Sequence, residues 1–143
     1  MSKRSNYNIK IVTWAAAEPL LRAVREPVFV IEQFVTPEFE WDDQDASATH
    51  VLALSAGNEP IGCARIVGNK VGRMAVLKHW RGLGVGRAIL EKAVFFCKQR
   101  GEKSVKLSAQ TQAIGFYTNA GFMVISEQYQ DLHIPHVDMQ LNI

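Results

Sequence analysis

The pattern of apolar and polar positions along the 143-residue chain predicts alternating strands and helices. Alternation over residues 8–13 indicates a first strand. An amphipathic helix follows, indicated by apolar residues spaced three or four apart: Leu21, Val24, Val28 and Ile31. Pro19 fits the first turn of that helix, where proline is tolerated. Pro27 removes a backbone donor, so we expect the helix to kink or split there.

The middle of the chain predicts three consecutive antiparallel strands, at residues 49–55, 61–67 and 70–77. Residues 56–60 form a turn between the first two of these strands. Gly68-Asn69 has the composition of a two-residue hairpin turn between the second and third.

The second half begins with the clearest helix of the sequence, residues 86–100, which Gly101 should terminate. A strand, a short helix and two further strands complete the pattern, at residues 104–109, 113–119, 122–126 and 134–141. The order is therefore β-α-β-β-β-α-β-α-β-β, an α+β fold with a mixed sheet of about seven strands. The strands on either side of helix 86–100 should be parallel, because a helical crossover joins them.

Composition and charge narrow the class of protein. The length fits one domain covering residues 1–143, and 48% hydrophobic residues are enough for a core. A net charge of +2 is too weak to indicate nucleic-acid binding. Residues 1–10 contain no secretory signal, and no apolar run approaches the ~20 residues that span a bilayer, so we expect a cytoplasmic protein without a membrane partner. Cys63 and Cys97 are expected to be buried free thiols.

A glycine-rich loop, Arg81-Gly82-Leu83-Gly84-Val85-Gly86-Arg87, lies between a predicted strand and the long helix. Alternate glycines allow positive φ angles and leave room for a ligand beside the backbone. The helix N-terminus and the two arginines add positive charge. These features favour a cradle for phosphate or pyrophosphate. The loop is neither a P-loop nor a Gly-x-Gly-x-x-Gly dinucleotide fingerprint. The alternative is a strand-to-helix turn that binds nothing.

The loop also resembles a known family signature. Arg81-x-x-Gly84-x-Gly86 matches the Gln/Arg-x-x-Gly-x-Gly/Ala motif of the GNAT acetyltransferase superfamily. Further segments match this superfamily in order and spacing: residues 73–76 with Trp80, and residues 113–117 with 120–122. Residues 28–33 and 134–139 resemble a branch of small bacterial members. The likeness covers nearly the whole chain.

The resemblance implies a GNAT-like twisted sheet whose fourth and fifth strands splay apart to admit acetyl-CoA. The pantetheine arm would pair with the backbone of Ala75 and Val76. The pyrophosphate would meet the N–H groups of Gly82, Gly84, Val85 and Gly86, assisted by the charges of Arg81 and Arg87. By the same resemblance, Tyr117 would protonate the departing CoA thiolate; the alternative is that Tyr117 only packs.

The general base is not evident from the sequence, because strand 70–77 lacks the carboxylate that some family members carry there. His136 is a candidate base or substrate ligand, and Glu32 and Gln33 are candidates for lining the acceptor pocket. An acidic cluster at residues 38–45 could attract a cationic amine; the alternative is a solvated loop. His133-x-x-His136 alone is a weak metal signal, so we expect no metal site.

Three functions remain open at this stage. The leading hypothesis is acetyl transfer from acetyl-CoA to a primary amine of a small molecule, by direct attack in a ternary complex. Direct attack is favoured because no Gly-x-Ser-x-Gly elbow is present and neither cysteine has a histidine nearby in the sequence. The alternatives are acetylation of a protein lysine or N-terminus, and a non-catalytic acyl-CoA sensor or assembly module. The resemblance also leaves room for a homodimer.

Overall fold

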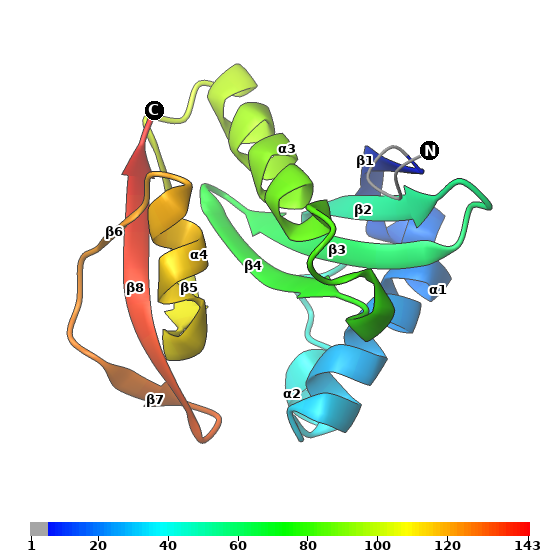
Figure 1. Cartoon of the computed structure of the whole chain (residues 1–143), viewed down its shortest axis with the longest axis horizontal. Coiled ribbons are helices and arrows are strands. Elements are labelled where there is room, and N and C mark those ends of the chain that lie inside the picture. The colour runs from blue at the N-terminus through cyan, green and yellow to red at the C-terminus, as the bar shows by residue number, and fades with distance from the viewer. Residues whose placement is uncertain (1–5) are drawn as a thin grey trace.

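The computed structural model describes residues 6–143 of the chain (Figure 1). Residues 1–5, on which the expectation of no secretory signal partly rests, lie outside the described residues. One mixed sheet has the strand order β1-β2-β3-β4-β5-β8-β6, with β7 paired to β8. The strands are β1 (Tyr7–Thr13), β2 (Thr49–Ser55), β3 (Pro60–Val67), β4 (Lys70–Val76), β5 (Ser104–Gln110), β6 (Met123–Val124), β7 (Tyr129–Asp131) and β8 (Ile134–Asn142). The predicted α+β fold is confirmed.

Helices of three kinds connect the strands. The α-helices are α1 (Trp14–Arg25), α2 (Pro37–Glu40), α3 (Val85–Gln99) and α4 (Ile114–Asn119). The others are the π-helix η2 (Glu26–Glu32) and the 3₁₀ turns η3 (Lys78–Trp80) and η4 (Thr111–Ala113).

The first helix differs from the prediction at its start. It begins at Trp14, five residues before Pro19, so Pro19 lies inside the helix and not in its first turn. The cause is an N-cap: the Thr13 side chain accepts a hydrogen bond from the Ala16 N–H at 3.2 Å. The expected break at Pro27 is confirmed, because the α-helix changes there into the π-helix η2.

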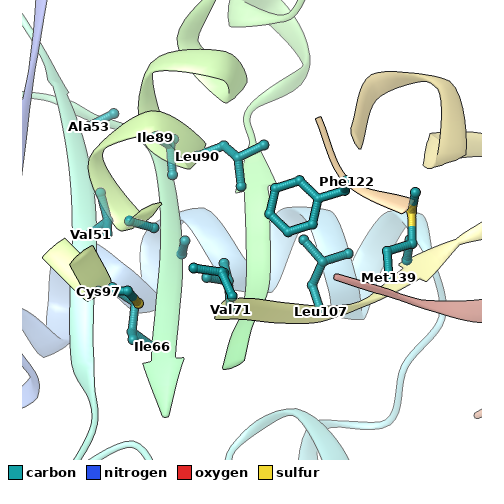
Figure 2. Packing of buried hydrophobic residues seen from close by; sticks show 14 of the residues in the cluster. Val51, Ala53, Ile66, Val71, Ile89, Leu90, Cys97, Leu107, Phe122 and Met139 are labelled. Carbon is teal, nitrogen blue, oxygen red and sulfur yellow. The ribbon is translucent and has the colours of Figure 1, made fainter. Parts of the chain in front are cut away.

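Two apolar clusters lie on opposite faces of the sheet. Alternate residues of β2 point in opposite directions, so Val51 and Ala53 join the cluster under α3 while Leu52 joins the cluster under α1. Figure 2 shows how the α3 cluster extends towards β5 and β8. There Phe122 lies beside Leu90. The cluster under α3 therefore joins residues of β2, β3 and β4 with residues of β5 and β8.

Strands β4 and β5 are the only parallel neighbours in the described sheet, as the crossover predicted. Their pairing is limited to Lys70 with Lys106 and Val71 with Leu107. Beyond it, β4 pairs only with β3, and a register shift accompanies Arg73, whose φ is +48°. This bulge bends β4. The two strands therefore diverge, as Figure 1 shows, and one edge of β4 is left without a partner strand.

Candidate active site

A cavity of about 840 Å³ lies where β4 and β5 diverge. Its walls come from β4, the glycine loop, the end of β5, α4, the π-helix and the β7–β8 turn. Most residues that the sequence singled out line it: Ala75, Val76, Arg81, Gly82, Gly84, Val85, Gly86, Arg87, Tyr117, Gln33 and His136. The fold thus gathers residues that lie far apart in the sequence around one space.

The glycine loop has the backbone conformation that a phosphate cradle needs. Gly82 and Gly84 have φ angles of +78° and +86°, in the left-handed region that favours glycine. A Cβ at Gly82 would have no atom within 4 Å, so this position opens to free space. Gly84 is the N-cap of α3 and has no side chain to cap the helix. The first N–H groups of α3 therefore remain available to an anion, and the residues fit the pyrophosphate of acetyl-CoA.

The two arginines beside this loop are engaged by carboxylates. The Arg81 guanidinium donates to both carboxylate oxygens of Glu32, at 2.8 and 3.1 Å, and its Nε donates to the Val76 carbonyl at 2.9 Å. Arg87 pairs with Glu91 one turn further along α3, at 3.2 Å. Glu32, expected in the acceptor pocket, thus lies against the cofactor loop and outside the lining of the cavity, whereas Gln33 lines the cavity.

Tyr117 presents its ring to the cavity from α4. The ring packs edge-to-face on Phe116 and on Phe122, with centroid distances of 5.1 and 6.0 Å. Burial raises the pKa of Tyr117 to about 12. The hydroxyl therefore keeps its proton at neutral pH, which is the state that a proton donor requires.

His136 lies on β8, buried and facing the same cavity. Its Nδ1 is 2.7 Å from the Ile134 carbonyl oxygen, and its ring stacks on Tyr129 at 6.0 Å between centroids. A carbonyl oxygen only accepts hydrogen bonds, so Nδ1 must carry the proton. In the neutral imidazole the lone pair is then on Nε2. This tautomer suits a proton acceptor or a ligand for an N–H group.

A chain of side-chain amides crosses the cavity between the two halves of the sheet. Gln110, at the end of β5, donates to the Gln33 side-chain oxygen at 2.7 Å. Gln112 donates in turn to Gln110 at 2.5 Å. The π-helix and the β5 end are thereby joined across the gap, with His136 directly opposite Gln110 in the β5–β8 register.

Several cavity residues were missed by the sequence reasoning. Ser108 and Gln110 line the cavity from β5, and their signal was available, because both occupy the polar positions of an alternating strand. Ser108 is hydrogen-bonded to the Tyr129 hydroxyl, which donates to Asp138 at 2.6 Å. Leu132 lines the cavity from the β7–β8 turn, which the sequence did not reveal.

Three carboxylates of the acidic cluster at residues 38–45 are paired with arginines, whereas Glu38 and Asp43 of the same cluster are exposed. Arg25, fully buried on α1, donates to Glu40 at 2.7 Å and to Asp45 at 2.8 Å. Arg65 pairs with Asp42 at 2.7 Å and with Asp45 at 3.1 Å. The expectation of a solvated loop was therefore wrong for Glu40 and Asp45, because arginines distant in sequence hold these two carboxylates in the interior.

A third arginine closes this ionic cluster. Arg73, at the β4 bulge, lies 3.3 Å from Glu40 and 3.3 Å from Asp42. It also donates to the Phe39 carbonyl at 3.1 Å. Three arginines thus face three carboxylates, and the cluster ties α1, the acidic segment, β3 and β4 into one unit beside the cavity.

Three further features concern residues 6–143. Among them, no group of three or more His, Cys, Asp or Glu side chains is placed to hold a metal ion, and His133 lies in the β7–β8 turn. No helix of this range is long and apolar enough to cross a membrane. Cys63 and Cys97 are both buried and unpaired, as predicted.

A sheet that opens beside a glycine-rich helix start is the architecture of an acyltransferase, and comparison with known proteins agrees. The family model described as "Acetyltransferase (GNAT) domain" matches residues 23–143. The chain belongs to the GNAT acetyltransferase family.

Individual relatives are similar over most of their length. The "Uncharacterized protein YyaT" of Bacillus subtilis is 36% identical, over 95% of this chain and 96% of that protein. The "Uncharacterized N-acetyltransferase YjcF" of the same organism is 37% identical, over 81% of this chain and 86% of that protein. A crystal structure of an acyl-CoA N-acyltransferase from Pseudomonas aeruginosa superposes with a TM-score of 0.83 at 26% identity, covering 94% of this chain and 99% of that one.

Proposed function

We propose that this enzyme transfers an acetyl group from acetyl-CoA to the primary amine of a small molecule. The observation that carries the proposal is that one cavity is lined both by the glycine loop and by Tyr117 and His136. A site for the donor's phosphates, the protonated hydroxyl of Tyr117 and Nε2 of His136 therefore share one cavity. A small acceptor is favoured over a protein chain because the cavity of about 840 Å³ must also hold part of the donor.

The donor would be held by backbone groups more than by side chains. The N–H groups of Gly82, Gly84, Val85 and Gly86 would meet its pyrophosphate, and the free edge of β4 at Ala75 and Val76 would pair with its pantetheine arm. Arg81 and Arg87 would add charge. When bound, acetyl-CoA supplies an activated acyl group as a thioester.

The proton-transfer roles follow from the two side chains at the cavity. Nε2 of His136 would accept a proton from the amine, directly or through water, because Nδ1 is committed to the Ile134 carbonyl. Tyr117 would give a proton to the departing thiolate. Direct attack by the amine is favoured over a cysteine intermediate, because burial raises the pKa of the Cys63 thiol to about 12 and also raises that of Cys97.

The test has two parts, donor binding and turnover. Calorimetry should detect acetyl-CoA binding to the purified protein. Release of free CoA should then depend on an amine when a panel of small amines is screened at fixed acetyl-CoA. Turnover only with peptides that carry a lysine or a free N-terminus would replace the small-molecule acceptor with a protein one. Tight binding of acetyl-CoA without turnover on either panel would favour the sensor alternative.

A further inference from the structure

The cavity beside the acidic segment offers little free negative charge to an acceptor. Arg25, Arg65 and Arg73 neutralise the buried or half-buried carboxylates of that segment, Glu40, Asp42 and Asp45. Asp131 is the other carboxylate that lines the cavity within the described chain, and it is exposed at the end of β7. A polycation would therefore find no carboxylate-lined pocket for its second charge.

Apolar side chains form the walls on both sides of this space. Val28 and Phe29 come from the π-helix, and Val35 follows it; all three are buried and line the cavity. Ile134 and Leu132 face the same cavity from the β7–β8 hairpin. Neutral polar groups and a histidine line the same cavity at Gln33, Gln44, Ser108, Gln110, Gln112 and His136, and charged groups line it at Glu40, Arg65, Lys70, Arg73, Arg81, Arg87 and Asp131. The charged lining is mostly cationic, so a second positive charge on the acceptor would be repelled, while the two apolar walls offer contacts to an apolar body.

In the β7–β8 turn, Leu132 lies at this wall with a backbone conformation that leucine rarely adopts. Leu132 and His133 have φ angles of +49° and +64°, a conformation that tight hairpin turns favour in glycine or asparagine. Neither residue is of those types. Strain of this kind is a sign of function where the strained side chain meets a site. Leu132 lines the cavity and is 38% exposed, whereas His133 lies outside the lining.

From these observations we infer that the acceptor is a primary amine with an apolar body, an alkylamine or arylalkylamine. Its amino group would lie near His136, and its body would lie between the π-helix wall and Leu132. Leu132 is then a residue that determines acceptor specificity. The inference rests on the proposed function and names its substrate class. Polyamines and amino sugars are poor acceptors in this view, because an added charge or hydroxyl would lose water against apolar walls.

The first experiment measures amine binding separately from turnover. Linear alkylamines of three to seven carbons are titrated calorimetrically into protein saturated with CoA, alongside 1,5-diaminopentane and glucosamine. Hexylamine and 1,5-diaminopentane have the same number of heavy atoms, so they differ in one terminal group, methyl or ammonium. We expect affinity to rise about fourfold for each methylene buried, and hexylamine to bind at least tenfold more tightly than the diamine. Equal or tighter binding of the diamine or of glucosamine would overturn the inference.

The second experiment uses two matched substitutions in the turn. Leu132→Gly and His133→Gly each relieve a positive φ, but only the first removes an apolar wall. Leu132→Gly should weaken hexylamine binding about tenfold and flatten the dependence on chain length, with CoA affinity unchanged. His133→Gly should leave amine affinity within twofold of the wild type. Unchanged hexylamine affinity in a folded Leu132→Gly protein would overturn the role of Leu132.

Turnover of the same amines separates this inference from the proposed function. Preferential binding of alkylamines without CoA release would contradict acetyl transfer to small amines, yet it would support an apolar pocket. Acetylation that is fastest with the diamine or with glucosamine would support acetyl transfer and would contradict the apolar acceptor.

Discussion

Arg81 and Glu32 form a two-point ion pair that joins the glycine loop to the π-helix, with N–O distances of 2.8 and 3.1 Å. A third hydrogen bond from Arg81 to the Val76 carbonyl fixes the guanidinium beside the free edge of β4. The pair places a negative charge next to the proposed pyrophosphate cradle. Glu32 therefore competes with the donor for the charge of Arg81.

Glu32→Gln should tighten acetyl-CoA binding, because the Arg81 charge would no longer be neutralised. Both side chains are partly exposed, so the gain should be small, about two- to fivefold in Kd. Calorimetry at low and high salt measures this gain, which should shrink as salt rises. Glu18→Gln is the matched control, since it breaks a similarly exposed pair with Arg22 outside the cavity lining. Weaker binding in Glu32→Gln would instead show that Glu32 serves to position Arg81.

Gly84→Val should abolish measurable acetyl-CoA binding while the protein still folds. A β-branched residue is strained at φ +86°, and relief of that strain would move the loop whose N–H groups at the start of α3 are proposed to meet the donor; its Cβ would lie 3.5 Å from the Tyr7 hydroxyl. Gly101→Val is the matched control, because Gly101 has φ +91° at the other end of the same helix, with open space around it. Both variants should lose a similar amount of thermal stability. Only Gly84→Val should lose calorimetric binding, and intact affinity in that variant would remove the loop from the donor site.

The glycine loop and the acidic cluster at residues 38–45 differ in how far the sequence alone predicts them. The glycine loop is a local feature: its conformation and its place before a helix follow from residues 81–87 alone. The acidic cluster is not local, because the arginines that neutralise it come from α1, β3 and β4. Its pairing depends on tertiary packing, so the sequence predicted only a solvated loop or a group of charges that attracts a cationic amine. The β7–β8 hairpin escaped detection because Leu132-His133 lacks the residues that usually mark such turns.

Asp45→Asn should destabilise the fold by about 1.5–3 kcal/mol, because it removes the charge that Arg25 and Arg65 share and leaves Arg25 with Glu40 and Arg65 with Asp42 as their remaining partners. Burial opposes ionisation of Asp45, but the hydrogen bonds and charges of Arg25 and Arg65 outweigh it and hold its pKa below the usual value. The contribution of this carboxylate to stability is therefore present above pH 3.8 and is lost as pH falls through the lower pKa of the folded state.

Urea unfolding at several pH values measures this effect. The free energy of unfolding of the wild type should fall more steeply with acidification than that of Asp45→Asn. Asp43→Asn is the control, since Asp43 is exposed in the same segment, and its stability should stay within about 0.5 kcal/mol of the wild type. A neutral effect of Asp45→Asn would mean that the ionic cluster adds little to stability.

Tyr117→Phe should leave acetyl-CoA affinity unchanged and lower kcat by about 10²–10⁴-fold, because it deletes only the proton that the thiolate would take. Because burial raises the pKa of Tyr117 to about 12, the wild-type rate should show no loss from ionisation of Tyr117 below about pH 11. Steady-state kinetics over pH 6–10 on an identified amine supplies both readouts. A variant that keeps more than half of the wild-type kcat would reduce Tyr117 to a packing residue.

His136→Asn separates the structural contact of His136 from its proposed proton transfer. The asparagine side-chain N–H₂ can replace Nδ1 as donor to the Ile134 carbonyl, but it offers no basic nitrogen at the position of Nε2. Folding and acetyl-CoA affinity should therefore be retained, while kcat falls by about 10²-fold or more. His136→Ala should lose the carbonyl contact in addition and be less stable than His136→Asn. An asparagine variant with the kcat of the wild type would show that the pocket itself deprotonates the amine, and His136 would then act only through its contacts with Ile134 and Tyr129.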